Sequence, residues 1–177
     1  MFAGAAAVAM FVLTAGAQTT TQTGMGKGGS AHVKTEWKVN GANVAIEYGR
    51  PSLKGRDEAQ MMPAGRPWRT GADEATVITT DKSLEFGKIT LAPGSYTINT
   101  QPGEKEWQII LGKLGQAKQW GVPYQAALEI GRVPMKLGKT AAPVEQVTYA
   151  IDPSKTGGTL RIEWGTTSVT TPFTVEK

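Results

Sequence analysis

The sequence predicts an all-β protein, an antiparallel β-sandwich or jelly roll with few or no helices. Hydrophobic and polar side chains alternate along most of the chain, as expected of strands that bury one face. Glycine and proline turns separate short runs rich in valine, isoleucine, threonine and aromatic residues, a spacing that favours a sandwich or barrel. The 22 glycines and 10 prolines of the 177-residue chain suit many such turns.

Two short segments precede the predicted domain. Residues 1–17 form an apolar run that is too short to span a bilayer, and they are typical of a secretory signal peptide cleaved after Ala17. Residues 18–30 hold almost no apolar side chains and predict a flexible linker. Residues 31–177 are long enough for one domain with its own core. The sequence therefore predicts an exported protein, periplasmic or extracellular, with no membrane span after the signal peptide.

The first predicted element of the domain is a hairpin. Residues 33–39 alternate between apolar and polar side chains, and residues 44–48 do the same. Between these runs, Asn40 and Gly41 tolerate the positive φ angles of a type I′ turn. The pattern therefore predicts two antiparallel strands joined at this turn.

Later strands are predicted where β-branched and aromatic runs lie between turn residues. They cover residues 75–80, 84–86, 89–91, 95–100, 107–111, 144–151, 159–164 and 168–175. Pro93 and Gly94 predict a turn that returns residues 95–100 from residues 89–91. Residues 125–130 predict either one helical turn or the approach to a strand.

Residues 49–76, which we call the charged segment, are longer and more charged than an ordinary connection. The bases are Arg50, Lys54, Arg56, Arg66 and Arg69, and the acids are Asp57, Glu58, Asp73 and Glu74. Converging guanidinium groups bind anions and carboxylates bidentately, so the bases are candidates for an anion site. Alternatively, bases and acids pair with one another and brace the segment onto the sheet. The near balance of charges favours the brace.

The acids of the charged segment also suggest a hydrolase. Asp73 and Glu74 are adjacent, so on a strand their side chains are expected to point to opposite faces. Either one, paired with Asp57 or Glu58, would resemble the two carboxylates of a glycosidase. Acidic residues beside the turn glycine Gly71 also commonly hydrogen-bond backbone amides, and this structural interpretation is favoured.

Composition excludes several other kinds of chemistry. The chain has no cysteine, which rules out disulfides, a thiolate nucleophile and cysteine-ligated metals. Its single histidine, His32, lies where the predicted linker meets the first strand, so we expect a solvated side chain and neither a zinc site nor a catalytic triad. The net charge of +4 is scattered along the chain, which argues against nucleic acid as a partner. We expect no metal and no cofactor.

The five tryptophans provide a possible glycan-binding surface, because exposed aromatic rings stack on sugar faces. Most of them lie at strand-like positions where core packing is the ordinary explanation. Trp120 lies in a predicted loop beside Tyr124, and Trp68 lies beside Arg69. These two are the candidates for stacking against a ligand.

Several runs of the sequence resemble a family of small exported bacterial proteins. The runs are RPSLKGR, PWRTGADEAT, GKITLAPGSYTI, EWQIIL, QWG and LRIEW, and they extend the resemblance from His32 to Val175. The family is grouped as domain of unknown function 2911. The resemblance implies an exported β-sandwich and no activity. Asp73 stands where the family pattern has asparagine, which changes the charge at that position.

Together these features favour a non-catalytic module that binds a small polar or anionic ligand or a glycan. The candidate binding residues are Arg50, Lys54, Arg56, Trp68, Arg69, Asp73, Glu74 and Trp120. One alternative is a carboxylate-dependent hydrolase. Another is a structural or protein-interaction module of the cell envelope, in which the charged segment serves only as a brace.

Overall fold

The computed structural model describes residues 18–115, 121 and 124–176. The strands are β1 (Gln18–Met25), β2 (Ala31–Val39), β3 (Ala42–Arg50), β4 (Ala72–Thr80), β5 (Leu84–Phe86), β6 (Ile89–Leu91), β7 (Gly94–Gln101), β8 (Glu106–Lys113), β9 (Glu129–Pro153) and β10 (Gly157–Val175). The helical elements are the short helix α1 (Glu58–Met61) and the 3₁₀ turn η1 (Ala126–Leu128). The predicted all-β class with few helices is confirmed.

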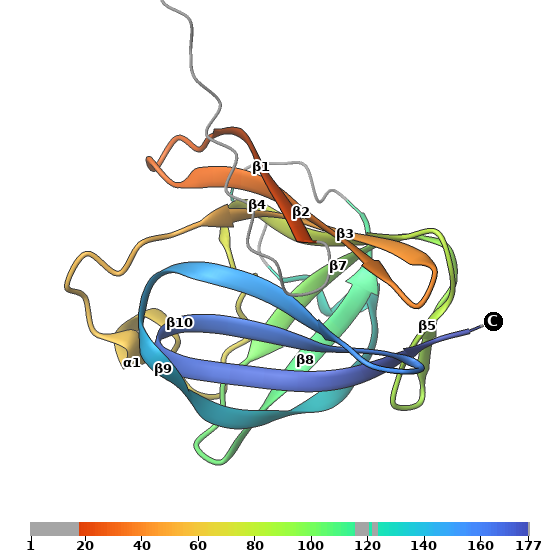
Figure 1. Ribbon diagram of the computed structural model, residues 1–177. Helices are drawn as coiled ribbons and strands as arrows, with labels where there is room; N and C mark the ends of the chain where they lie inside the picture. The colour runs from red at the N-terminus through yellow and green to blue at the C-terminus, as the bar shows by residue number, and fades with distance from the viewer. Residues whose placement is uncertain (1–17, 116–120, 122–123, 177) are drawn as a thin grey trace, which may run out of the picture.

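The strands form one antiparallel sheet in the order β1-β2-β3-β4-β7-β8-β9-β10-β5-β6. In place of the two separate sheets expected of a sandwich, this single sheet curls over itself. Figure 1 shows β1 to β4 lying across from β8, β9 and β10, and β2 and β3 contact β9. The facing sides share one apolar core, to which β2 contributes Trp37 and β10 contributes Trp164. No helix in the described part of the chain is long and apolar enough to cross a membrane.

The predicted N-terminal hairpin is confirmed. Val33 of β2 lies opposite Tyr48 of β3, and the two strands pair along their whole length. Asn40 and Gly41 have φ angles of 47° and 80°, as a type I′ turn requires. This turn fixes the register that places alternate side chains of both strands in the core.

Strand β1 occupies residues that were predicted to form a flexible linker. Its backbone pairs with β2 from Gln18 to Met25, and the Trp37 indole N–H donates to the Gln18 side-chain oxygen at 3.1 Å. The linker prediction is therefore wrong for Gln18–Met25. An edge strand is held by backbone hydrogen bonds to its neighbour and keeps most side chains in solvent, so it does not need apolar residues. Residues 1–17, where the signal peptide is predicted, lie outside the described residues.

The predicted return of residues 95–100 against residues 89–91 is wrong. Strand β6 pairs with β5, in the register Leu84 opposite Leu91, whereas β7 pairs with β4 and β8. Gly87, with a φ angle of 60°, is the first residue of the tight turn that joins β5 to β6. Residues 125–130 contain both of the predicted alternatives, a helical turn and the approach to a strand. The 3₁₀ turn η1 comes first and leads directly into β9.

Buried tyrosines join the two sides of the curled sheet. The rings of Tyr48 on β3 and Tyr149 on β9 meet edge to face, with centroids 4.6 Å apart. The Tyr149 hydroxyl donates to the carbonyl of Thr70 at 2.9 Å, and the Tyr149 amide donates to the Tyr48 hydroxyl at 3.3 Å. Burial raises the pKa of Tyr149, so its hydroxyl remains protonated and continues to donate.

Replacing Tyr149 with phenylalanine is expected to lower the free energy of unfolding by about 1–2 kcal/mol, because the buried Thr70 carbonyl loses its tyrosine donor. Urea denaturation at pH 7 measures this change. Tyr96→Phe is the matched control, since the Tyr96 hydroxyl bond to Ala92 is solvent-exposed and its loss is expected to cost less than about 0.5 kcal/mol. Equal losses in the two variants would contradict the importance of the buried contact.

Candidate functional site

The charged segment connects one side of the curled sheet to the other. Just after β3, Ser52 forms a bridge with Gln146 of β9, and the Leu53 amide donates to the Glu145 carbonyl at 2.9 Å. The chain then turns at Lys54 and Gly55, enters α1, and returns as β4, which pairs with β3. The segment is therefore anchored to β9 at its beginning and to the β3–β4 pairing at its end.

The bases of the charged segment make contacts mainly to backbone oxygens. Arg50 donates to the Val147 carbonyl at 3.0 Å and to the Thr148 hydroxyl at 2.9 Å. Arg56 donates to the carbonyls of Leu53 and Ser52, and Arg69 donates to the carbonyl of Asp73. Lys54 is exposed, and its backbone amide donates to the Glu145 carboxylate at 2.7 Å. The segment is braced to the sheet as expected, but these arginines use carbonyl and hydroxyl acceptors where carboxylates were predicted.

Two acids of the charged segment organise α1. Asp57 caps the helix by accepting from the Ala59 amide at 2.8 Å. Glu58 accepts from the Thr166 amide at 2.7 Å and the Thr167 hydroxyl at 2.8 Å, which ties α1 to β10. Partial burial raises the pKa of Glu58, but the hydrogen bonds from these threonines outweigh that effect and hold the pKa below its usual value. Such a carboxylate is suited to structural anchoring and is a poor general acid.

The candidate stacking residue Trp68 is half-buried and packs against the core. Its ring stacks on Trp164 with centroids 5.4 Å apart and an interplanar angle of 17°. Its backbone exchanges two hydrogen bonds with Thr100 of β7, at 2.7 and 2.8 Å. Trp68 is therefore occupied by protein contacts. Trp120 lies outside the described residues.

The remaining acids converge on the single histidine. The Nε2 atom of His32 lies 3.0 Å from a carboxylate oxygen of Asp73, and its Nδ1 atom lies 3.3 Å from a carboxylate oxygen of Glu74. The side chains of His32, Asp73 and Glu74 are 22%, 6% and 35% exposed. We call these three residues the imidazole–carboxylate cluster. The expectation that His32 is solvated is wrong, because β1 and its turn extend the structure beyond the residue where the linker was predicted to end.

The convergence of Asp73 and Glu74 also corrects the expectation that they point to opposite faces. Asp73 has a φ angle of 65°, a left-handed conformation that interrupts the alternation of β4 at its start. Aspartate tolerates this conformation better than most residues do. Both carboxylates therefore reach one ring. Gly26, in the turn after β1, packs against the cluster so closely that a Cβ atom there would overlap the Asp73 carboxylate.

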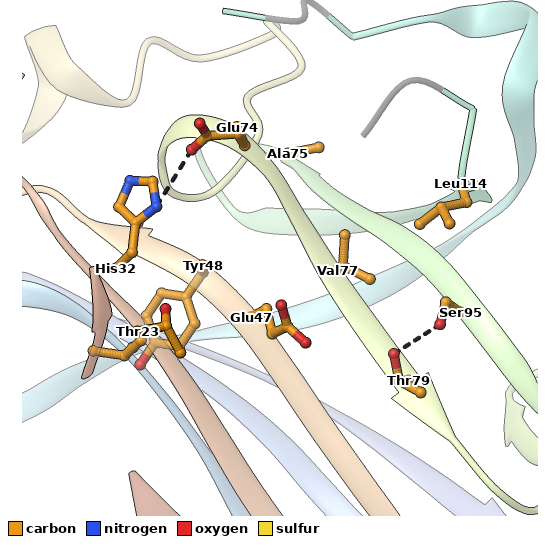
Figure 2. Close-up of a pocket in the computed structure, with 12 residues that line it drawn as sticks. Thr23, His32, Glu47, Tyr48, Glu74, Ala75, Val77, Thr79, Ser95 and Leu114 are labelled. Atoms are coloured by element: carbon orange, nitrogen blue, oxygen red, sulfur yellow. Dashed lines mark hydrogen bonds and ion pairs between the residues drawn. The ribbon is translucent and has the colours of Figure 1, made fainter. Parts of the chain in front are cut away.

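An open cleft of about 470 Å³ begins at this cluster and runs across the outer face of the sheet. Figure 2 shows His32 and Glu74 at one end, Glu47 of β3 in the middle, and Thr79 and Ser95 at the far end. Thr79 and Ser95 share a hydroxyl hydrogen bond of 2.8 Å. Val77 and Leu114 provide an apolar part of the wall. Of the sequence-predicted site residues, Glu74 lies in this cleft.

A second polar cluster lies on β7, β9 and the chain just before β9. Arg132 donates to Glu129 at 2.8 Å, to the Tyr124 hydroxyl at 3.1 Å and to the Gln101 side chain at 2.7 Å. The hydrogen bond to Glu129 raises the pKa of Tyr124, and Arg132 lowers the pKa of Glu129. These groups satisfy one another, so the cluster acts as a brace. Sequence reasoning missed it, although Glu129 and Arg132 are three residues apart.

The imidazole–carboxylate cluster is not arranged to hold a metal. Each ring nitrogen of His32 faces a different carboxylate, which leaves neither nitrogen directed at a shared point. Among the described residues, no group of three or more histidine, aspartate or glutamate side chains has a metal-binding arrangement. The geometry instead provides hydrogen-bond acceptors along one wall of an open cleft.

Comparison with known proteins identifies the family. Residues 30–173 match the family described as protein of unknown function (DUF2911), so the chain belongs to that family. No curated protein and no solved structure matches the chain. The predicted family is confirmed.

Replacing Gly26 with alanine is expected to separate the β1 turn from the imidazole–carboxylate cluster, because the added methyl overlaps Asp73. We expect a loss of about 1–3 kcal/mol in the free energy of unfolding, the usual cost of overpacking. Gly24→Ala is the control, since a Cβ at Gly24 has nothing within 4 Å. The two variants are compared by urea denaturation at pH 7. If Gly26→Ala were as stable as Gly24→Ala, the close packing would be refuted.

Replacing Glu58 with glutamine is expected to destabilise the protein by about 1 kcal/mol at pH 7, because the charged acceptor of two hydrogen bonds becomes neutral. The folded pKa of Glu58 is lowered, so its stabilisation is present at neutral pH and is lost as the pH falls below the ordinary glutamate value of about 4.3. The difference between variant and parent should therefore shrink in acid.

Thermal unfolding between pH 3 and pH 7 measures this dependence. Glu104→Gln, at an exposed position in the β7–β8 turn, is the control and should show little difference at any pH. A Glu58→Gln deficit that stayed constant down to pH 3 would contradict a lowered pKa.

Proposed function

We propose that this protein is an exported, non-catalytic binding module that holds a small polar ligand in the cleft beside His32 and Glu74. The observation that carries the proposal is the cleft itself, because an open concavity with a few polar groups and an apolar wall is the usual form of a small-molecule site. We place the ligand in this cleft and not at the arginines of the charged segment, because Arg50 and Arg56 already donate to protein oxygens.

The polar groups of the cleft favour a ligand rich in hydrogen-bond donors. Glu47 and Glu74 present carboxylate oxygens, which accept hydrogen bonds, and Thr79 and Ser95 present hydroxyl groups. Two carboxylates on one wall repel an anion, whereas they attract the hydroxyl groups of a glycan or the ammonium group of an amine. We therefore favour a glycan-like or cationic ligand over an anionic one.

The hydrolase alternative has less support. Asp57 caps α1 and Glu58 binds Thr166 and Thr167, so both carboxylates have structural partners. A general acid needs a raised pKa, whereas the pKa of Glu58 is lowered. The interaction-module alternative is favoured by one observation, that β1 is an end strand of the sheet with mostly exposed side chains.

Binding is tested by following backbone amide signals during titration with three probes: chitotriose as a neutral glycan, putrescine as a cation and inorganic phosphate as an anion. We expect chitotriose or putrescine to shift amides of β3, β4 and β7 around Glu47, Glu74 and Ser95, and phosphate to leave them unchanged. Glu47→Gln and Glu74→Gln should each weaken binding by about tenfold, the effect of losing one charge-assisted hydrogen bond.

Arg56→Ala is the matched control for the titration, because the Arg56 guanidinium contacts only oxygens of its own loop in the described structure. It should leave the affinity unchanged. Preferential binding of phosphate, or a loss of binding in Arg56→Ala with none in Glu74→Gln, would overturn the proposal. Absence of binding by all three probes, with self-association through β1, would favour the interaction module.

A further inference from the structure

His32 has two carboxylate partners, but only one protonation state satisfies both. A neutral imidazole carries a single N–H and donates to one partner, whereas the imidazolium carries two N–H groups and donates to both. The 3.0 Å contact with Asp73 has hydrogen-bond geometry, and the 3.3 Å contact with Glu74 lies within ion-pair distance, so a ring protonated on both nitrogens serves both carboxylates. Loss of one proton must therefore leave one of the carboxylates without its donor.

The geometry identifies Glu74 as the carboxylate that is released. Asp73 is nearly buried, forms the shorter contact and packs against the turn at Gly26. Glu74 is 35% exposed and lies in the cleft, and its oxygen near His32 does not have the geometry of a full hydrogen bond. When the remaining proton of His32 is on the nitrogen facing Asp73, the other nitrogen presents a lone pair to Glu74. Two acceptors then face each other, and Glu74 is the one with room to turn away.

We infer that His32 is a proton-operated gate on the cleft: the protonated ring holds Glu74, and the neutral ring releases Glu74 to accept a hydrogen bond from the ligand. This inference rests on the proposed function, because it assigns the regulation of the same cleft. It also predicts which protonation state of His32 favours ligand binding. Binding is strong when the ring is neutral and weak when the ring is protonated.

The charged groups around the ring support a gate operated by His32. Asp73 and Glu74 face it from β4, and Glu47 lies farther along the cleft on β3. Arg69 donates to the Asp73 carbonyl, and Lys27 follows Gly26 in the turn after β1. Carboxylates titrate mostly below about pH 5, and lysine and arginine remain charged to about pH 10, whereas histidine changes charge between about pH 5 and 8. His32 is the only histidine in the chain, so every histidine ring signal of this protein comes from it.

The first test needs no ligand. Side-chain NMR follows the His32 ring nitrogens and the Glu74 carboxyl carbon in the full chain between pH 5 and pH 8. We expect the two signals to change with the same midpoint, and the neutral ring to carry its proton on Nε2. A Glu74 signal that stays constant while His32 titrates, or a neutral ring protonated on Nδ1, would overturn the gate whatever the cleft binds.

The second test measures affinity for chitotriose and putrescine at pH 5.5 and pH 7.5. We expect about tenfold stronger binding at pH 7.5, the effect of freeing one charged acceptor. His32→Gln has no ionisable ring and should bind equally at both pH values, and Glu74→Gln should lose most of the pH dependence while still folding. Equal affinity of the parent at both pH values, or a pH dependence that persists in both variants, would overturn the gate.

The two tests separate failure of the gate from failure of the proposed function. Suppose that neither probe binds at either pH while the His32 and Glu74 signals change together. The contact between His32 and Glu74 is then shown to depend on the proton, and the proposed ligand class is refuted. If a probe binds in the cleft with no pH dependence, the binding module stands and the gate falls. Because Glu74 is partly exposed, Glu74→Gln supplies the comparison even if His32→Gln fails to fold.

Discussion

The curled sheet depends on one buried contact, in which Tyr149 of β9 reaches across the core to Tyr48 and to the carbonyl of Thr70. Strands far apart in a sheet have no backbone hydrogen bonds between them, so side chains must hold the two sides together. Thr70 lies just before β4 and also bonds to the hydroxyl of Thr100 at 2.8 Å. The contact thus fixes the point from which β4 starts, and with it the positions of Asp73 and Glu74.

Features encoded by neighbouring residues were predictable from the sequence, and features that depend on distant pairing were not. Asn40 and Gly41 determine their turn locally, so the first hairpin and its register follow from the sequence. Strand β1 is defined by its pairing with β2, and its polar composition alone resembles a linker. The β5–β6 pairing was missed because Pro93 and Gly94 also satisfy the rules for a hairpin turn, and only the neighbours of β7 exclude it.

In the candidate site, too, local features were predictable and contacts between distant residues were not. The charged segment was predicted to supply most of the binding residues, and Glu74, near its end, lies in the cleft. Its histidine partner is more than 40 residues away in sequence, and the left-handed conformation of Asp73 that brings both carboxylates to the ring has no sequence signature. Aspartate is one of the few residues other than glycine that tolerate this backbone conformation. Asp73 therefore both permits the turn and supplies the charge that engages His32.

The alternation of the strands explains why the proposed ligand cleft lies on the outer face. Thr76, Ile78 and Thr80 of β4 point into the core, which leaves Val77 and Thr79 on the opposite side. Because the curled sheet fills its interior with its own side chains, an interior cavity for a ligand would require deleting core volume. The outer face carries no such cost. The interrupted alternation at Asp73 turns Glu74 toward His32, so the irregular start of β4 creates the end of the cleft at which these two side chains meet.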